Sequence, residues 1–180
     1  MRLILALILS ALLAVPAAAR PLSSDEEAAL WKSADAYLRA IGRGDAKGIV
    51  AALPPRILNV FAGATGVEVK KLEETLVEQT AAVTKGTKFS ELAAKRDGVN
   101  AEDAVLADGT AVTWVLVPTS FVTESKGKKA RNNQPLLAVR EADKWYFLRI
   151  DGPERQQMAT LAYPFLAGMA FPAAAVTPLN

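Results

Sequence analysis

Apolar residues recur at helical spacing near the start of the chain. From Ser24 to Ile41 they fall on one face, and Gly42 and Gly44 follow directly, so the pattern predicts a helix that ends at these glycines. Ser24 and Glu27, three residues apart, predict a capping box at its first turn. The expected buried stripe consists of Leu30, Ala34, Tyr37, Leu38 and Ile41.

Three further helical segments are expected before residue 87. Asp45 is placed to cap a short helix over Asp45–Leu53, and Pro55 suits the first turn of another that runs through Phe61. Residues 67–86 have the pattern of a longer amphipathic helix that stops at Gly86. Its apolar stripe is Val69, Leu72, Leu76 and Val83.

The periodicity changes in the second half of the chain. Thr113–Glu124, Gln134–Arg140 and Trp145–Ile150 are rich in β-branched and aromatic residues, so they predict three antiparallel strands. Residues 125–133 and 141–144 are expected to be the hairpin connections between them. Lys88–Arg96 has a composition that permits a helix, but its position before the strands favours an edge strand.

Both faces of these strands carry apolar side chains. A sheet with one face in water alternates apolar with polar residues, so we expect something to cover each face here. The helices can cover one face, and the other needs a cavity with its lid, a partner subunit or the apolar C-terminal tail. On the first predicted strand, one face carries Trp114, Leu116 and Val122, and the other carries Val115, Val117 and Phe121. On the last predicted strand, one face carries Trp145, Phe147 and Arg149, and the other carries Tyr146, Leu148 and Ile150.

The first nineteen residues predict a signal peptide. Arg2 precedes an apolar run over Leu3–Val15, and Pro16 and small residues follow, so we place cleavage after Ala19. The run is shorter than the ~20 residues that span a bilayer, which favours cleavage over an uncleaved anchor. We therefore expect a periplasmic or secreted protein without a transmembrane segment after cleavage.

The remaining 161 residues (180 − 19) suit one domain. We expect it to cover residues 20–155 and to be followed by an apolar helix and tail over residues 156–180, which Pro164, Pro172 and Pro178 interrupt. Without Arg2 the chain has 20 basic and 19 acidic side chains, a balance that argues against nucleic-acid binding. It has no cysteine, which excludes disulfides, thiolate metal sites and lipid attachment through cysteine.

Two stretches together carry a family resemblance. Ala34–Leu53 contains a Gly-Asp turn between two helices, and Leu136–Gly152 ends the strands with a Trp-Tyr-Phe run. This arrangement resembles the NTF2-like (nuclear transport factor 2-like) superfamily, which includes ketosteroid isomerases and SnoaL-type polyketide cyclases, over about residues 24–152. The resemblance implies an α+β fold in which N-terminal helices pack on a curved antiparallel sheet around a cone-shaped cavity.

The residues available limit the chemistry. The absence of histidine and cysteine excludes Ser-His-Asp, Cys-His and histidine-bound zinc sites. The resemblance implies that an isomerase-like site would pair an Asp base with a Tyr donor, for which Tyr37 is the candidate. No acid lies between Asp45 and Glu68, where the base of that family would fall, and Asp35 lies off the buried stripe. The sequence thus favours a non-enzymatic protein with no catalytic residue and no cofactor.

Two clusters of charged residues, one acidic and one basic, are expected to be ordinary surface features. Glu102, Asp103 and Asp108 lack the spacing of a calcium loop, so we expect no metal site there. The basic residues over Lys126–Arg131 predict a solvated hairpin tip that hinders pairing of the sheet edge, and contact with anionic lipid or lipopolysaccharide is the alternative.

Three functional hypotheses follow. The first is an exported, non-enzymatic domain that binds a small apolar ligand or an envelope partner, with Trp and Tyr tips as polar groups in the pocket. The second is an interaction or homodimerisation module that uses the apolar tail and a sheet face, and the third is a SnoaL-like or isomerase-like enzyme. Candidate ligand-binding residues are Tyr37, Trp114, Leu116, Trp145 and Phe147, and candidate interface residues are Phe165, Met169 and Phe171.

Overall fold

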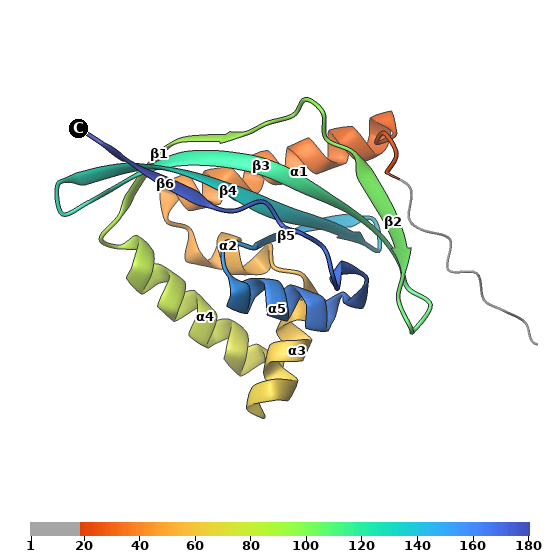
Figure 1. Ribbon diagram of the computed structural model, residues 1–180. Helices are drawn as coiled ribbons and strands as arrows, with labels where there is room; N and C mark the ends of the chain where they lie inside the picture. The colour runs from red at the N-terminus through yellow and green to blue at the C-terminus, as the bar shows by residue number, and fades with distance from the viewer. Residues whose placement is uncertain (1–18) are drawn as a thin grey trace, which may run out of the picture.

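A computed structural model describes residues 19–180. The expected signal peptide, residues 1–19, therefore lies outside the described residues except for Ala19. The chain has the expected α+β class: four helices precede a curved, open antiparallel sheet, and a short helix lies between its fifth and sixth strands (Figure 1).

The first helix, α1 (Ser24–Arg43), starts one residue earlier than the sequence pattern predicts. The capping box is formed by Ser23 and Glu26 instead of Ser24 and Glu27. The Glu26 N–H donates to Ser23 Oγ over 3.3 Å, and the Ser23 N–H donates to Glu26 Oε2 over 2.9 Å. The helix ends at Gly44, whose positive φ of 64° suits glycine.

The next three helices match the predicted punctuation. Asp45 caps α2 (Ala46–Ala51), because its carboxylate accepts from the Gly48 N–H over 3.0 Å. Pro55 opens α3 (Pro55–Thr65), as expected for a proline in the first turn. The amphipathic α4 (Val69–Thr84) contains no fully buried residue, although the sequence predicts an apolar stripe on it.

The sheet has six strands instead of the three that the sequence pattern identifies. Their order is β1-β3-β4-β5, with β2 also paired to β3 and β6 also paired to β4. The expected edge strand at residues 88–96 is confirmed as β1. The strands are β1 (Lys88–Ala94), β2 (Ala101–Val105), β3 (Ala111–Ser125), β4 (Lys128–Glu141), β5 (Lys144–Arg149) and β6 (Ala175–Leu179).

The expected hairpin between the first two predicted strands is confirmed, but its connection is shorter than the predicted residues 125–133. The connection between β3 and β4 is the two-residue turn Lys126–Gly127, with positive φ at both residues, and β4 begins at Lys128. Polar residues that resemble a loop in the sequence thus extend the hairpin, because they pair with β3 on one side and with β6 on the other.

Two facing prolines, Pro118 and Pro135, mark the middle of this long hairpin. On the β3 side, β1 pairing ends at Thr119 and β2 pairing begins at Val115. On the β4 side, β6 pairing ends at Asn133 and β5 pairing begins at Leu136. Both flanks therefore change strands at these prolines, which lack an N–H to offer a neighbouring strand. We call this position the proline seam.

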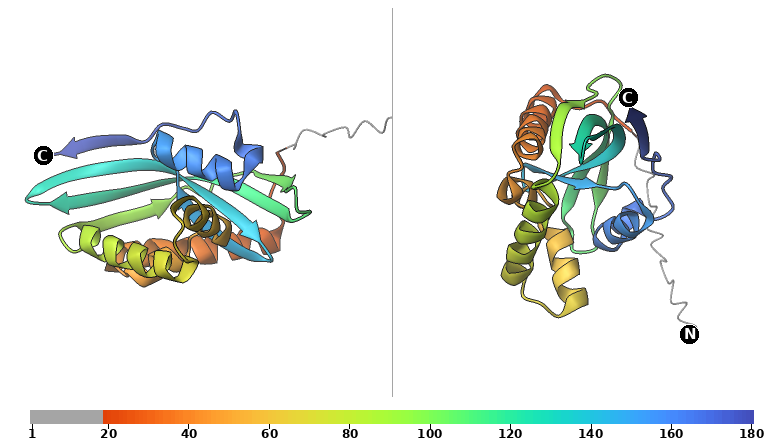
Figure 2. Two further views of the ribbon diagram at one scale, coloured as in Figure 1. Left: turned by 90° about the horizontal axis from the view of Figure 1, so that it is seen from below. Right: turned by 90° about the vertical axis from the view of Figure 1, so that its left-hand side faces the viewer.

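Each side of the sheet is covered by a different part of the chain (Figure 2). The side packed against α1, called the helix side here, buries Val115, Val117 and Phe147. The other side, called the tail side, is covered by α5 (Pro153–Ala162), the 3₁₀ turn η1 (Pro164–Leu166) and the segment after it, with help from α3. The expectation that both faces are shielded is confirmed, and the apolar tail supplies the second cover.

Residues 156–180 are thus integrated into the fold. Phe165, Met169 and Phe171 pack against the tail-side core, and β6 extends the sheet beside β4. The Tyr163 hydroxyl, which is fully buried, donates to Glu141 Oε1 over 2.6 Å and ties this segment to the end of β4. The expected boundary at residue 156 therefore falls within α5 and does not separate two structural units.

Candidate functional site

The five predicted ligand-binding residues divide between the two sides of the sheet. Tyr37, Trp145 and Phe147 are buried on the helix side, whereas Trp114 and Leu116 belong to the tail side. Because the sheet separates the two groups, these residues cannot line one common pocket.

The helix-side residues form part of a packed core. Tyr37 stacks on Phe147 with ring centres 5.3 Å apart, and both rings are almost completely buried. Burial raises the pKa of the Tyr37 hydroxyl, while the positive charges of Arg149 and Arg155 act in the opposite direction. Trp145 is also buried, and its Nε1 has no hydrogen-bond partner among residues 19–180.

The three predicted interface residues serve the tail side of their own chain. Phe165 stacks on Trp114 with ring centres 5.9 Å apart and also contacts Tyr163. Met169 and Phe171 are partly buried in the same core. The large apolar side chains that remain exposed lie on different parts of the chain: Val67, Val83, Val105, Leu161 and Val176.

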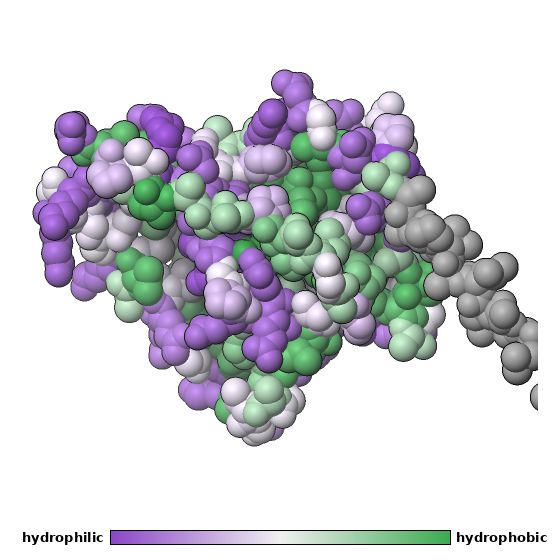
Figure 3. Space-filling model, in the orientation of Figure 1, coloured by the Kyte–Doolittle hydropathy of each residue, from purple (hydrophilic) through white to green (hydrophobic). Residues whose placement is uncertain are grey.

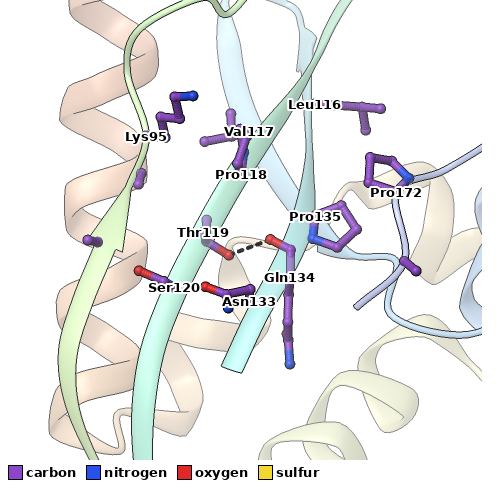
Figure 4. A pocket seen from close by; sticks show the side chains of 13 residues that line it. Lys95, Leu116, Val117, Pro118, Thr119, Ser120, Asn133, Gln134, Pro135 and Pro172 are labelled. Atoms are coloured by element: carbon purple, nitrogen blue, oxygen red, sulfur yellow. Dashed lines mark hydrogen bonds between the residues drawn. The ribbon is translucent and has the colours of Figure 1, made fainter. Parts of the chain in front are cut away.

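A groove of about 470 Å³ lies at the proline seam on the tail side. It runs from the end of β1 across β3 and β4 to the segment around Pro172 (Figure 4). Leu116, Pro135 and Pro172 form one end, where their side chains lie close together in Figure 4. The volume is in the range of pockets that hold small molecules. Of the five predicted ligand-binding residues, Leu116 lines this groove.

The groove has an aliphatic lining with a few polar groups. Alanine, valine, leucine and proline side chains dominate, and no aromatic residue lines it. Asn133 and Ser120 lie side by side in Figure 4, and Lys95, the residue after β1, lies nearer Val117. The Thr119 hydroxyl donates to the Gln134 carbonyl oxygen over 2.9 Å. Gln134 lies two residues from Leu136 in β4, so its side chain is directed to the helix side of the sheet, away from the groove.

Sequence patterns did not identify most of this groove. Its walls come from three strands and the tail, and their meeting depends on the proline seam and on the path of residues 167–174. The available signal was the presence of Pro118 and Pro135 within two runs that otherwise predict strands, because proline in a strand marks an edge or an irregularity.

The carboxylates are held mainly in ion pairs. Asp35 receives two hydrogen bonds of 3.0 Å from Arg96 on the outside of α1. Asp151 is the carboxylate whose charge acts on Tyr37, and it pairs with Arg149 over 2.6 Å and with Arg155. Burial alone would raise the pKa of Asp151, but the two arginines outweigh it and lower the pKa. Asp151 is therefore a weak base beside Tyr37.

Of the three acidic residues considered for a metal site, Asp103 and Asp108 are in separate ion pairs, and Glu102 is in none among the described residues. Asp103 binds Arg20 and accepts a hydrogen bond of 2.7 Å from the Thr113 hydroxyl. Asp108 binds Arg56 over 2.8 Å and also accepts from the Thr110 N–H. Over residues 19–180, no three His, Cys, Asp or Glu side chains are placed to hold one metal ion.

None of the helices in the described part of the chain combines the length and apolar character needed to cross a bilayer. Comparison of the sequence with protein-family models and with curated proteins, and of the fold with solved structures, finds no match of any of the three kinds.

Proposed function

We propose that this protein is an exported, non-enzymatic NTF2-like domain of the periplasm that binds a small aliphatic ligand. The observation that carries the proposal is the groove at the proline seam, which is large enough for such a ligand and lined mostly by aliphatic side chains. Asn133 and Ser120 in the lining and the Lys95 ammonium group at the rim are polar groups that could orient a ligand there.

The NTF2-like assignment is supported by element order and shape. Helices come first, then a curved antiparallel sheet, with the Gly44–Asp45 turn leading from α1 into α2. Strand β5, which ends the β3–β4–β5 meander, carries the Trp145–Phe147 aromatic run with its two outer rings on the helix side. A likeness of this kind concerns the fold, and the ligand is proposed from the groove alone.

Export is supported by the anchoring of Arg20, the residue that follows the expected cleavage point. Its backbone exchanges two hydrogen bonds of 2.8 Å with Ala101 in β2. Its guanidinium binds Glu26 over 2.8 Å and Asp103 over 2.5 Å. A chain that begins at Arg20 would keep all of these contacts, so cleavage after Ala19 is compatible with the complete fold.

A non-enzymatic role is supported by the state of the acidic groups near Tyr37. General-base catalysis needs a carboxylate free to take up a proton in contact with the substrate. Asp151 is neutralised by Arg149 and Arg155, and Asp35 is paired with Arg96 in a pair that is open to solvent. The proposal accordingly assigns binding and no catalysis.

A groove-filling variant tests the proposal. Ala173 lines the groove and Ala174 does not, so Ala173→Trp blocks the site while Ala174→Trp is a matched control on the same exposed segment. We expect fatty acids and aliphatic alcohols of graded length to raise the Tm of the wild-type protein and of Ala174→Trp, and to leave Ala173→Trp unchanged.

Native mass spectrometry of the same three proteins would count the bound molecules. Absence of any Tm shift with the wild type, or equal shifts with both tryptophan variants, would contradict binding in this groove.

A further inference from the structure

A second concavity, of about 550 Å³, lies at the end of the sheet that carries the β3–β4 turn. Three segments far apart in the sequence form it: the end of α1, the end of α4 with the start of β1, and the hairpin turn. Its cationic side chains are Arg43, Lys85, Lys88 and Lys126. In Figure 3, hydrophilic side chains gather at this end of the molecule. We call this concavity the basic site.

Packing holds the three segments in place. A Cβ added at Gly44 would meet the Thr84 side chain at 3.7 Å, so the ends of α1 and α4 are in van der Waals reach of each other. The Ser125 hydroxyl donates to the Gly86 carbonyl oxygen over 3.1 Å and fixes the hairpin against the loop before β1. Lys88 is directly opposite Glu124 in the β1–β3 register. The cations are therefore brought together by the fold and not by sequence proximity.

The charges at the basic site are unbalanced. None of its four cationic side chains forms an ion pair with any of residues 19–180. Glu124 is the one acidic residue in the lining, and Lys129 already binds it over 3.7 Å. The C-terminal ends of α1 and α4 each contribute roughly half a negative charge. Glu124 and the two helix ends together supply about two negative charges, so the four cations leave a net charge of about +2 at the basic site.

We propose that the basic site binds a phosphate or diphosphate group, carried either by a lipid headgroup or by a free small molecule. Several lysines and an arginine around a concavity supply the point charges and the planar donors that phosphate oxygens accept. The hydroxyls of Thr84 and Thr87 already donate to helix carbonyls, so the cationic side chains are the donors that the site offers to an anion. This site is separate from the groove at the proline seam, and neither proposal depends on the other.

The test uses two probes and two charge-matched variants. The site variant, Lys85→Glu with Lys126→Glu, reverses two exposed cations of the lining that form no ion pair within residues 19–180. The control, Lys32→Glu with Lys70→Glu, makes the same change in net charge at exposed positions outside the basic site. The probes are inorganic pyrophosphate, measured by calorimetry, and vesicles of phosphatidylglycerol against vesicles of phosphatidylcholine, measured by co-sedimentation.

At low ionic strength we expect the wild type to bind at least one anionic probe and to ignore phosphatidylcholine. The site variant should bind at least about tenfold more weakly, and the control within about twofold of wild type. Pyrophosphate binding would identify a soluble phosphate ligand, and binding to phosphatidylglycerol alone would identify a membrane headgroup. Equal losses in both variants would show diffuse attraction and overturn the proposal, as would failure of the wild type to bind either probe.

Circular dichroism melts of both variants distinguish a binding defect from unfolding. A site variant that melts within a few degrees of the control and binds as well as wild type also overturns the proposal.

Discussion

The β3–β4 hairpin has two halves with opposite character, divided by the proline seam. In the half that holds residues 111–117 and 136–141, Val115, Leu137 and Ala138 have no exposed surface, because helices and tail cover both sides. In the half that holds residues 118–134, Lys128 and Asn133 are exposed and the covering segments are fewer. We call these the covered half and the distal half. Both candidate sites involve the distal half, where packing leaves polar groups free.

The largest effect should come from removing the cover of the tail side. Deletion of residues 164–180 uncovers Trp114 and Leu116 and removes the buried apolar groups of Phe165, Leu166, Met169 and Phe171. Leu166 is fully buried and the other three are partly buried, so losing the four side chains costs roughly 4–8 kcal/mol, which is comparable to the whole stability of many domains. We expect the truncated protein to lose its cooperative urea transition.

Deletion of residues 175–180 is the matched truncation. It removes β6, whose residues are almost all exposed and pair with the distal half alone. We expect this protein to keep a cooperative transition with a free energy of unfolding lowered by about 1–2 kcal/mol. Equal damage from both truncations would show that the tail-side core depends on the outer edge of the sheet.

Truncating one phenylalanine on a strand that pairs with each half gives the next comparison. Phe147, on β5 beside the covered half, is buried against Tyr37, whereas Phe89, on β1 beside the distal half, is half-buried and packs beside Phe121. Phe147→Ala should lower the free energy of unfolding by about 3–5 kcal/mol, and Phe89→Ala by about 1–2 kcal/mol, because less contact is lost. Urea titration followed by tryptophan fluorescence measures both; a larger loss for Phe89→Ala would reverse the proposed order.

The pH dependence of stability measures how much the ion pair between Arg20 and Glu26 at the start of the fold contributes. Hydrogen bonds from the Arg20 side chain and the Ser23 N–H lower the pKa of Glu26 from 4.5 to about 2. The stability from this group is complete above pH ~4.5 and disappears as the pH falls to about 2, with a total of about 3 kcal/mol. Glu26→Gln should lower stability at pH 7 and flatten the pH dependence across that window.

Glu74→Gln is the control for this titration. Glu74 is exposed on α4 and lies 3.5 Å from Lys71, so its replacement should change stability by less than about 0.5 kcal/mol at any pH. If the Glu26 variant follows the wild-type curve between pH 4.5 and 2, the assignment of the acid transition to Glu26 is wrong.

The smallest effect is expected at the distal surface. Arg131 binds Glu91 over 2.6 Å, but both side chains are well exposed to water. Arg131→Ala should therefore change the free energy of unfolding by less than about 1 kcal/mol, and added salt should reduce the difference further. A loss greater than 2 kcal/mol on thermal or urea unfolding would mean that this end of the hairpin is more tightly coupled to the core than its exposure indicates.

The sequence predicted the elements that depend on local signals. Asp45 and Pro55 open their helices as expected, and the β-branched and aromatic runs are strands. β2 and β6 were missed, because Ala101–Val105 has acidic residues and Ala175–Leu179 contains a proline. Both strands are recognisable only through their pairing with β3 and β4, which is a tertiary effect.

The candidate site was predicted less well, for a reason of register. Residues that pair directly across neighbouring strands point to the same side of the sheet. Trp114 pairs with Val139, and Val139 pairs with Tyr146, so these three residues share the tail side. Trp145 therefore lies on the opposite side from Trp114. A loop expected over residues 125–133 conceals this register, whereas the two-residue turn at Lys126–Gly127 fixes it. Leu116 was identified because it shares the side of Trp114 that the tail covers.

The proline seam also has a consequence for the dynamics of the native state. No flanking strand crosses it, so β2 and β5 attach to one half of the hairpin and β1 and β6 to the other. Fraying at the turn can then spread through β1 and β6 without breaking a ladder that includes β2 or β5. Backbone amides should accordingly exchange with deuterium in two tiers, with slow exchange at Val115 and Leu137 and faster exchange at Thr123 and Ala130.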